Sequence, residues 1–173
     1  LHILPFFPYT SDDGFSVTDY MSVNPELGDW EDIKKIGKDY DLMIDLVINH
    51  VSKSHLWFKN FLENKEPGKN FFIQPSPDDD LSFVIRPRST PLLTEFKAVD
   101  GNRNVWTTFS DDQIDLNFRN PEVLLEILKV FLFYIRQGIR ILRLDAIAFL
   151  WKQAGTACMH LPENHEIVKL LRT

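Results

Sequence analysis

The most informative stretch of the chain is Ile139-Arg140-Ile141-Leu142-Arg143-Leu144-Asp145-Ala146, an apolar segment that ends with an arginine and an aspartate two residues apart. Side chains alternate between the two faces of a strand, so we expect Arg143 and Asp145 on the same face. A charged pair in a buried parallel strand is costly to desolvate, and it therefore indicates a functional site at the carboxyl end of that strand. A buried structural ion pair is the alternative interpretation.

Two further segments place polar residues next to an apolar strand. They are Asp12-Asp13-Gly14-Phe15 and Asp45-Leu46-Val47-Ile48-Asn49-His50. Together with Arg143-Leu144-Asp145-Ala146, and in this order along the chain, they resemble the α-amylase superfamily, whose members act on glycosides and fold as (β/α)8 barrels. The resemblance implies an enzyme with its site at the carboxyl ends of the barrel strands.

Other segments look like the sucrose phosphorylase branch of that superfamily, and the resemblance covers nearly the whole chain. These segments are Arg86-Pro87-Arg88, Trp106-Thr107-Thr108-Phe109, Gln113-Ile114-Asp115-Leu116 and Lys152-Gln153-Ala154-Gly155-Thr156. The stretch from Arg86 to Phe96 looks closer to the glucosylglycerate phosphorylases than to sucrose phosphorylase itself.

The length of the chain, 173 residues, is short for a complete (β/α)8 TIM barrel, which takes about 250 residues. The chain also opens on a strand-like segment and stops within a helical pattern. We therefore expect an internal fragment with an α/β fold, a partial barrel holding about strands 2 to 4. The predicted divisions are a barrel part at 1–50, an inserted B-type subdomain at 51–118 and a second barrel part at 119–173.

Local patterns predict the individual elements. Asp29 and Asn120 are expected to cap helices, the second with Pro121 at its first position and Gly138 just past its end. That second helix is apolar on most sides, which predicts that it is buried all round. The other expected elements are helices at 30–38, at 54–62 and from about 162, and strands at 42–48, around 83–85, around 105–108 and at 140–144.

Composition excludes some partners. The chain has 19 lysines and arginines against 25 aspartates and glutamates, a net charge of −6. No basic stripe is available to neutralise phosphates, so we expect no nucleic-acid partner, and no apolar run reaches the length of a membrane span. The single Cys158 cannot form an internal disulfide, which is consistent with a reducing, cytoplasmic location.

The chemistry of glycoside cleavage gives the charged pair a role. A retaining enzyme uses two carboxyl groups about 5–5.5 Å apart, one as nucleophile and one as general acid. The resemblance implies that Asp145 is the catalytic nucleophile and that Arg143 keeps it ionised by favouring its charged form. It also places the general acid and the transition-state stabiliser after later strands, outside this chain.

The resemblance assigns sugar binding to Asp12, Phe15 and His50. A sugar presents hydroxyl edges that need donors and acceptors, and an apolar face that suits an aromatic ring. Asp12 is preferred over Asp13 because it stands three residues before Phe15, as the family pattern requires. A merely structural histidine is the alternative for His50.

Asn49 has two interpretations. In many amylases this position helps to bind a structural Ca²⁺, whereas sucrose phosphorylases resemble the calcium-free members. The oxygen ligands that Ca²⁺ needs cannot be identified in the insertion, so we expect no metal and no cofactor.

Arg86 and Arg88 flank a proline that stiffens the inserted loop. Guanidinium groups bind phosphate or carboxylate through paired hydrogen bonds, so the pair is a candidate anion clamp, with Arg88 the stronger candidate. A solvated surface loop is the alternative. Inorganic phosphate is the co-substrate that the resemblance implies, and a glycerate leaving group would also be an anion.

The sequence thus predicts part of a retaining glycoside phosphorylase. It would transfer an α-glucosyl unit from sucrose or glucosylglycerate to phosphate and release α-glucose 1-phosphate, with a small-molecule sugar and phosphate as its partners. Alternatives are an α-glucoside hydrolase or transglucosidase with the same nucleophile, and a non-catalytic barrel homologue that acts as an interaction module.

Overall fold

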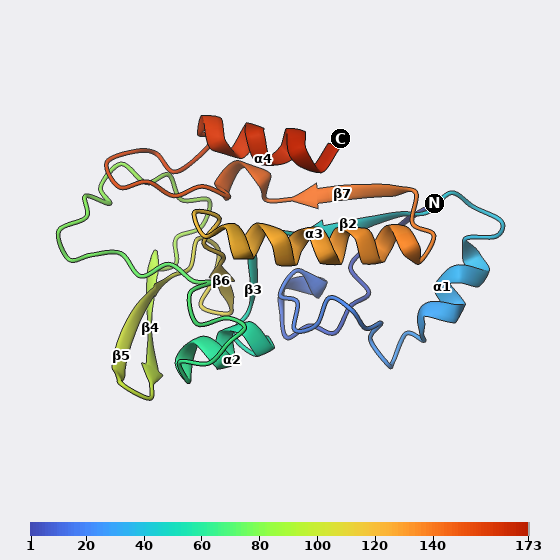
Figure 1. The fold of residues 1–173 in the computed structure, drawn as a ribbon, viewed down its shortest axis with the longest axis horizontal. Coiled ribbons are helices and arrows are strands. Elements are labelled where there is room, and N and C mark those ends of the chain that lie inside the picture. The colour runs from blue at the N-terminus through green and yellow to red at the C-terminus, as the bar shows by residue number, and fades with distance from the viewer. Residues whose placement is uncertain (173) are drawn as a thin grey trace.

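The computed structural model describes residues 1–172 and is built on a three-stranded parallel sheet. The sheet contains β1 (His2–Ile3), β2 (Met43–Val47) and β7 (Ile141–Asp145) in the order β1-β2-β7. In the register of β2 and β7, Asp45 lies beside Arg143 and Val47 beside Asp145. Three adjacent parallel strands agree with the expected part of a barrel, and their carboxyl ends meet at one edge (Figure 1).

The two capped helices form as predicted. The Asp29 side chain accepts hydrogen bonds from two backbone amides at the start of α1 (Trp30–Ile36), in a capping box. Asn120 caps α3 (Pro121–Arg136), which has Pro121 at its first position. Gly138 follows with a φ of +93°, a conformation that glycine adopts without strain. The last helix, α4, covers Pro162–Arg172.

The burial of α3 differs from the prediction. One stripe, made by Val123, Ile127, Val130 and Tyr134, is buried. On the other side Leu125 is 56% exposed and Leu132 48% exposed. The prediction that this helix is buried all round is therefore wrong for the described residues, because only one face of α3 packs on the rest of the chain.

Residues 51–118 do not continue the strand–helix alternation. They contain α2 (Leu56–Leu62), the hairpin of β4 (Leu93–Ala98) and β5 (Gly101–Trp106), and β6 (Gln113–Asp115). β6 pairs with β3 (His50–Ser52), which follows closely after β2. The hairpin extends away from α3 and the parallel sheet (Figure 1).

The predicted strand around 105 is confirmed as the end of β5, whereas the one at 83–85 is wrong. Phe83 is 62% exposed and Ile85 50% exposed, and neither lies in a strand. Three consecutive apolar residues do not show the alternation of a half-buried strand. The partner of β5 is β4, where Leu93, Phe96 and Ala98 alternate in part with polar residues.

Aromatic packing attaches the loop after β1 to α3 and to β2. The ring of Phe7 stacks on Tyr134 at 5.0 Å between centroids. Tyr134 donates a hydrogen bond to the carbonyl of Tyr20, and the Tyr20 hydroxyl donates to the carbonyl of Val47 at 2.7 Å. The loop between β1 and α1, which includes the 3-10 turn η1 (Asp12–Gly14), is thereby held at the carboxyl end of β2.

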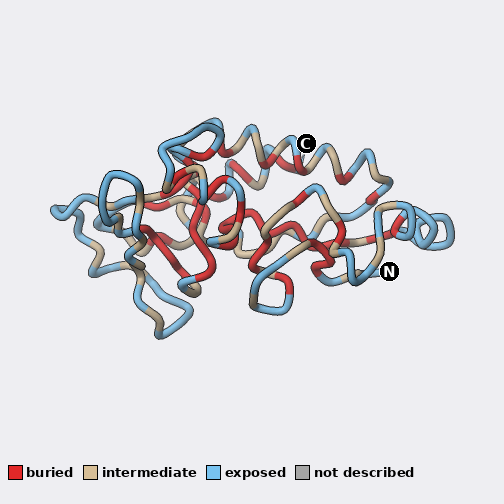
Figure 2. The backbone as a smooth tube through the Cα atoms, turned by 90° about the horizontal axis from the view of Figure 1, so that it is seen from below, coloured by how far each residue is buried: buried red, intermediate tan, exposed pale blue. Residues whose placement is uncertain are grey.

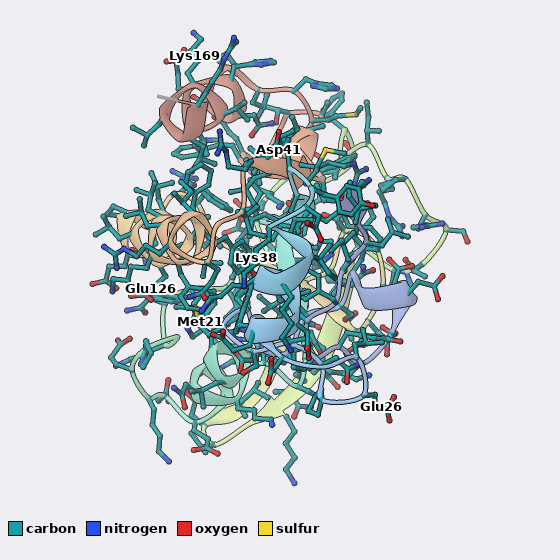
Figure 3. The ribbon with its side chains drawn as sticks, turned by 90° about the vertical axis from the view of Figure 1, so that its right-hand side faces the viewer. Met21, Glu26, Lys38, Asp41, Glu126 and Lys169 are labelled. Atoms are coloured by element: carbon teal, nitrogen blue, oxygen red, sulfur yellow. The ribbon has the colours of Figure 1, made fainter. Side chains whose placement is uncertain are left out.

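Buried residues run through the middle of the molecule, and exposed segments extend at both ends of its long axis (Figure 2). Seen from the side of α1, Lys169 on α4 and Glu26 before α1 lie on opposite sides, with Lys38 and Asp41 between them (Figure 3). No helix within residues 1–172 is long and apolar enough to cross a membrane.

Candidate active site

Asp145 is the last residue of β7 and lies beside Arg143, as the alternation of the strand predicts. Arg143 Nη1 is 3.4 Å from Asp145 Oδ1, and the Asp145 side chain is 23% exposed. The same guanidinium nitrogen forms an ion pair with the fully buried carboxylate of Asp45 on β2. Arg143 therefore bridges a buried carboxylate and a partly open one. The 3-10 turn η2 (Ile147–Phe149) follows directly.

The pKa of Asp145 is raised above the ordinary value, first of all because burial penalises the charged carboxylate. His50 and Arg143 oppose this effect and lower the pKa, whereas the charges of Asp45 and Asp12 raise it. Arg143 favours the ionised form, as expected, but burial outweighs it. Ionised Asp145 is thus a poorly solvated carboxylate, and the charges of these four side chains shift its pKa.

His50 is buried, and its contacts determine its tautomer. Its Nε2 lies 3.0 Å from the carbonyl oxygen of Phe15, which can only accept, so Nε2 carries the proton. Nδ1 lies 3.3 Å from the Asn49 amide nitrogen. Burial lowers the pKa of His50 although Asp115 and Asp145 raise it. His50 is thus a neutral donor held against the backbone of Phe15, whose own ring is half-buried.

Asp12 lies in η1 with a φ of 56°, in the left-handed region. The amide nitrogen of Gln113, on β6, donates to Asp12 Oδ2 at 2.8 Å and lies 3.1 Å from His50 Nε2. The side-chain amide of Gln113 therefore binds Asp12 and lies against His50, but it forms no hydrogen bond with the protonated Nε2 because both nitrogens are donors. Asp12 and Asp13 are both exposed, and Asp12 is the one whose carboxylate Gln113 holds.

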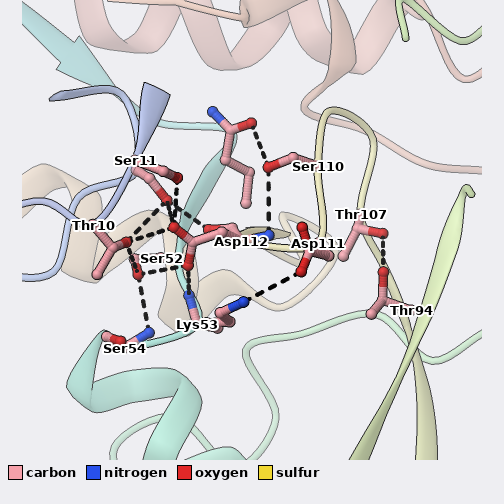
Figure 4. Close-up of polar contacts among 12 residues, drawn as sticks. Thr10, Ser11, Ser52, Lys53, Ser54, Thr94, Thr107, Ser110, Asp111 and Asp112 are labelled. Atoms are coloured by element: carbon pink, nitrogen blue, oxygen red, sulfur yellow. Dashed lines mark hydrogen bonds and ion pairs between the residues drawn. The ribbon is translucent and has the colours of Figure 1, made fainter. Parts of the chain in front are cut away.

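A cluster around Asp112 fixes this loop (Figure 4). The Asp112 carboxylate accepts hydrogen bonds from the hydroxyls of Thr10 at 2.6 Å and Ser11 at 2.5 Å. It also accepts from Ser16 and Ser52 at 3.0 Å each. These four hydroxyls lower the pKa of Asp112 and offset its desolvation. The cluster joins the loop that carries Asp12 to β3 and to the end of the insertion.

One of the two inserted arginines, Arg88, lies beside a sugar-binding candidate. Arg88 lines a groove of about 630 Å³ that also contains Asp12, Lys53, Phe109 and Gln113. Arg86 is exposed and is not among the residues that line this groove. Of the expected pair, Arg88 is the one that shares a groove with a sugar-binding candidate.

A buried ammonium group holds the oxygens next to Asn49. Lys152 Nζ donates to Asn49 Oδ1 at 2.8 Å and forms an ion pair with Asp115 at 2.6 Å. Thr108 donates its amide and its hydroxyl to the same carboxylate. These acceptors are already bound to a cation of the chain, so the donor set does not fit an additional Ca²⁺. Residues 1–172 contain no group of three or more acidic, histidine or cysteine side chains placed to hold a metal.

Sequence reasoning assigned no role to Gln113, Asp115 or Lys152, although all three lie in the segments that carry the resemblance. A polar residue within a buried strand pattern was the available signal for Gln113 and Asp115. Lys152 comes 37 residues after Asp115, so only the folded chain shows that they pair.

Known proteins resemble this chain over nearly its whole length. Residues 1–172 match the family described as alpha amylase, catalytic domain. Glucosylglycerate phosphorylase of Spirochaeta thermophila is 56% identical over 172 residues, which are 99% of this chain and 29% of that protein. Glucosylglycerate phosphorylase of Escherichia coli is 52% identical over 174 residues, which are 100% of this chain and 31% of that protein.

The crystal structure of sucrose 6F-phosphate phosphorylase from Thermoanaerobacter thermosaccharolyticum has a TM-score of 0.89 and 33% sequence identity. The match covers 98% of this chain and 38% of that one. The chain spans 29% and 31% of the two curated relatives. By its match to the family over residues 1–172, the chain belongs to the alpha-amylase catalytic-domain family.

Proposed function

We propose that this chain carries the nucleophile of a retaining glycoside phosphorylase that transfers an α-glucosyl unit from glucosylglycerate to phosphate. The observation that supports the reaction most directly is Asp145 at the end of β7, bridged to Asp45 by Arg143 and influenced by the charges of His50 and Asp12. The relatives that are 56% and 52% identical are glucosylglycerate phosphorylases, which favours glucosylglycerate over sucrose as the donor.

The first step breaks the glycosidic bond. A carboxylate oxygen of Asp145 bonds to the anomeric carbon while the bond from that carbon to the glycerate oxygen breaks. The leaving oxygen takes a proton from the general acid, which the family resemblance places outside this chain. Arg143 orients Asp145, and ionisation of Asp145 is required because only the carboxylate can attack.

The sugar is positioned by neutral His50 and by Asp12. His50 can offer its Nε2 proton to a sugar hydroxyl in exchange for the Phe15 carbonyl, and the Asp12 carboxylate can accept from a sugar hydroxyl. Phe15 supplies an aromatic surface for the apolar face of the ring. The Asp112 cluster and Gln113 hold these groups in place before the sugar arrives, which reduces the entropy lost on binding.

In the second step an oxygen of phosphate attacks the anomeric carbon and the bond to Asp145 breaks, which gives α-glucose 1-phosphate. Arg88 lies in the same groove as Asp12 and is the proposed contact for the incoming anion. We expect no metal beside Asn49, because Lys152 already supplies a positive charge to Asn49 and Asp115.

The test uses a protein that carries this chain within a complete barrel. Glucose 1-phosphate and free glucose are measured from glucosylglycerate and from sucrose over a series of phosphate concentrations. We expect glucose 1-phosphate as the main product at saturating phosphate, with glucosylglycerate the better donor. Free glucose as the main product would instead identify a hydrolase, and no reaction with either donor would favour the non-catalytic homologue.

A further inference from the structure

A line of polar side chains crosses the parallel sheet from β1 to β7. His2 Nε2 on β1 lies 2.8 Å from Asp45 Oδ2 on β2. The other oxygen of Asp45 pairs with Arg143 on β7, and Arg143 reaches Asp145. Each link joins neighbouring strands or residues of one strand face, so the line ends at the proposed nucleophile.

Asp45 is the member of this line that loses most solvation free energy on burial. Its side chain is fully buried, and its neighbours along β2, Ile44 and Leu46, are fully buried apolar residues. A carboxylate in this position must be compensated for its desolvation, whereas an apolar side chain would pack there without that cost. Within residues 1–172 its carboxylate oxygens bind only His2 and Arg143. Packing of the sheet therefore does not explain the presence of Asp45.

Arg143 needs a fixed partner to be useful at the site. Its side chain is 47% exposed, and a long exposed arginine has many accessible rotamers. The link to buried Asp45 restricts the guanidinium, and the 3.4 Å approach to Asp145 is the looser of its two contacts. If Oδ2 of Asp45 lost its partner, the carboxylate could turn both oxygens toward Arg143 and draw it away from Asp145.

We propose that His2 is a positioning residue, which holds Asp45 so that Arg143 stays beside Asp145. This inference rests on the proposed function, in which Asp145 is the nucleophile. His2 touches no substrate. Its effect on the reaction passes through two further side chains, and it should appear in the ionisation of Asp145 rather than in sugar binding.

The direction of the effect follows from the charges that face Asp145. These come from Arg143 and His50, which lower its pKa, and from Asp45 and Asp12, which raise it. Without His2, Arg143 moves toward Asp45 and the pKa of Asp145 rises further. Because only the carboxylate attacks, the acid limb of kcat/KM then moves to higher pH.

The experiment compares His2→Leu with His2→Gln in a protein that carries this chain within a complete barrel. Gln can present an amide donor to Asp45 Oδ2, whereas Leu cannot. For Leu we expect kcat to fall about tenfold, the loss typical of one hydrogen bond to a charged group. KM for the glucosyl donor should change little, the acid limb should move to higher pH, and Gln should restore both kcat and the acid limb.

His55→Ala is the matched control. His55 is a buried histidine that caps α2 by accepting from the Trp57 amide, and it lies outside the line. The control should lower the melting temperature and leave the acid limb unchanged. Should His2→Leu not fold, His2→Asn replaces it, because its shorter amide stops short of Asp45.

The role of His2 is overturned if the folded variant that cannot donate to Asp45, His2→Leu or His2→Asn, has the same acid limb as the parent. It is also overturned if His55→Ala moves the acid limb to the same extent. Failure of the proposed function is recognised separately with Asp145→Asn. If that variant keeps the activity of the parent, Asp145 is not the nucleophile, whatever the His2 variants do.

Discussion

At the scale of single residues, the spacing of Arg143 and Asp145 was enough to predict that they share a face, because a strand repeats every two residues. The sequence did not predict the other partners of these residues. Asp45 is nearly a hundred positions away from Arg143 in the chain, and Gln113 reaches Asp12 across a comparable separation. Contacts of this kind depend on how the elements pack, which a local pattern does not contain.

The position of Gln113 leads to a prediction about sugar binding. Gln113→Leu removes the amide that donates to Asp12 and leaves the Asp12 carboxylate without that partner. Losing a hydrogen bond to a charged group costs roughly 1.5–3 kcal/mol, or about ten- to a hundredfold. We expect KM for the glucosyl donor to rise within this range, as measured by initial rates. Gln74→Leu, at an exposed site, is the control, and equal KM values in the two variants would contradict the role of Gln113.

Arg88 leads to a prediction about the second step. Arg88→Ala should slow transfer to phosphate about ten- to a hundredfold and change formation of the glucosyl-enzyme much less, because only the second step uses phosphate. The two steps are separated by pre-steady-state measurement of glycerate release and of glucose 1-phosphate formation. Arg119→Ala, also exposed, is the control. If the ratio of the two rates stays at its parent value, Arg88 does not contact phosphate.

At the scale of elements, capping signals gave the clearest predictions. Asp29 and the pair Asn120 and Pro121 mark helix starts through local hydrogen bonds, so α1 and α3 begin where expected. β4 was missed although its residues partly alternate, and the strand at 83–85 was predicted from three apolar residues that remain largely exposed. A strand requires a partner, and the sequence does not say which segment provides it.

The link between β6 and the loop after β7 leads to a stability prediction. Lys152→Met removes the ammonium that compensates the buried carboxylate of Asp115. An uncompensated buried charge costs about 3–5 kcal/mol, so the midpoint of urea unfolding should fall sharply. The double substitution Lys152→Met with Asp115→Leu should recover part of the loss. Unchanged unfolding of the single variant would contradict this account of the pair.

The same pair predicts the response to metal removal. Because Lys152 occupies the acceptors beside Asn49, treatment with a chelator should leave the melting temperature and the activity unchanged. Thermal unfolding with and without added Ca²⁺ measures this. A melting temperature that rises with Ca²⁺ and falls with chelator would show a bound metal that the donor set does not suggest.

At the scale of the whole molecule, the isolated chain is expected to aggregate. The outer edges of β1 and β7 are unpaired within residues 1–172, and Leu4 and Ile141 are 64% and 50% exposed. Open strand edges and uncovered apolar side chains promote association. We predict that the 173-residue chain expressed alone aggregates and transfers no glucosyl unit. A soluble monomer with a cooperative thermal transition in size-exclusion and melting experiments would contradict this.

The most direct test of the central claim is to trap the covalent intermediate. A protein that carries this chain within a complete barrel is treated with 5-fluoro-α-glucosyl fluoride, and its peptides are analysed by mass spectrometry. We predict one added fluoroglucosyl unit, on the peptide that contains Asp145 and at that residue, and no addition in Asp145→Asn. A label on another residue, or turnover of the Asn variant within tenfold of the parent, would contradict the assignment of Asp145 as the nucleophile.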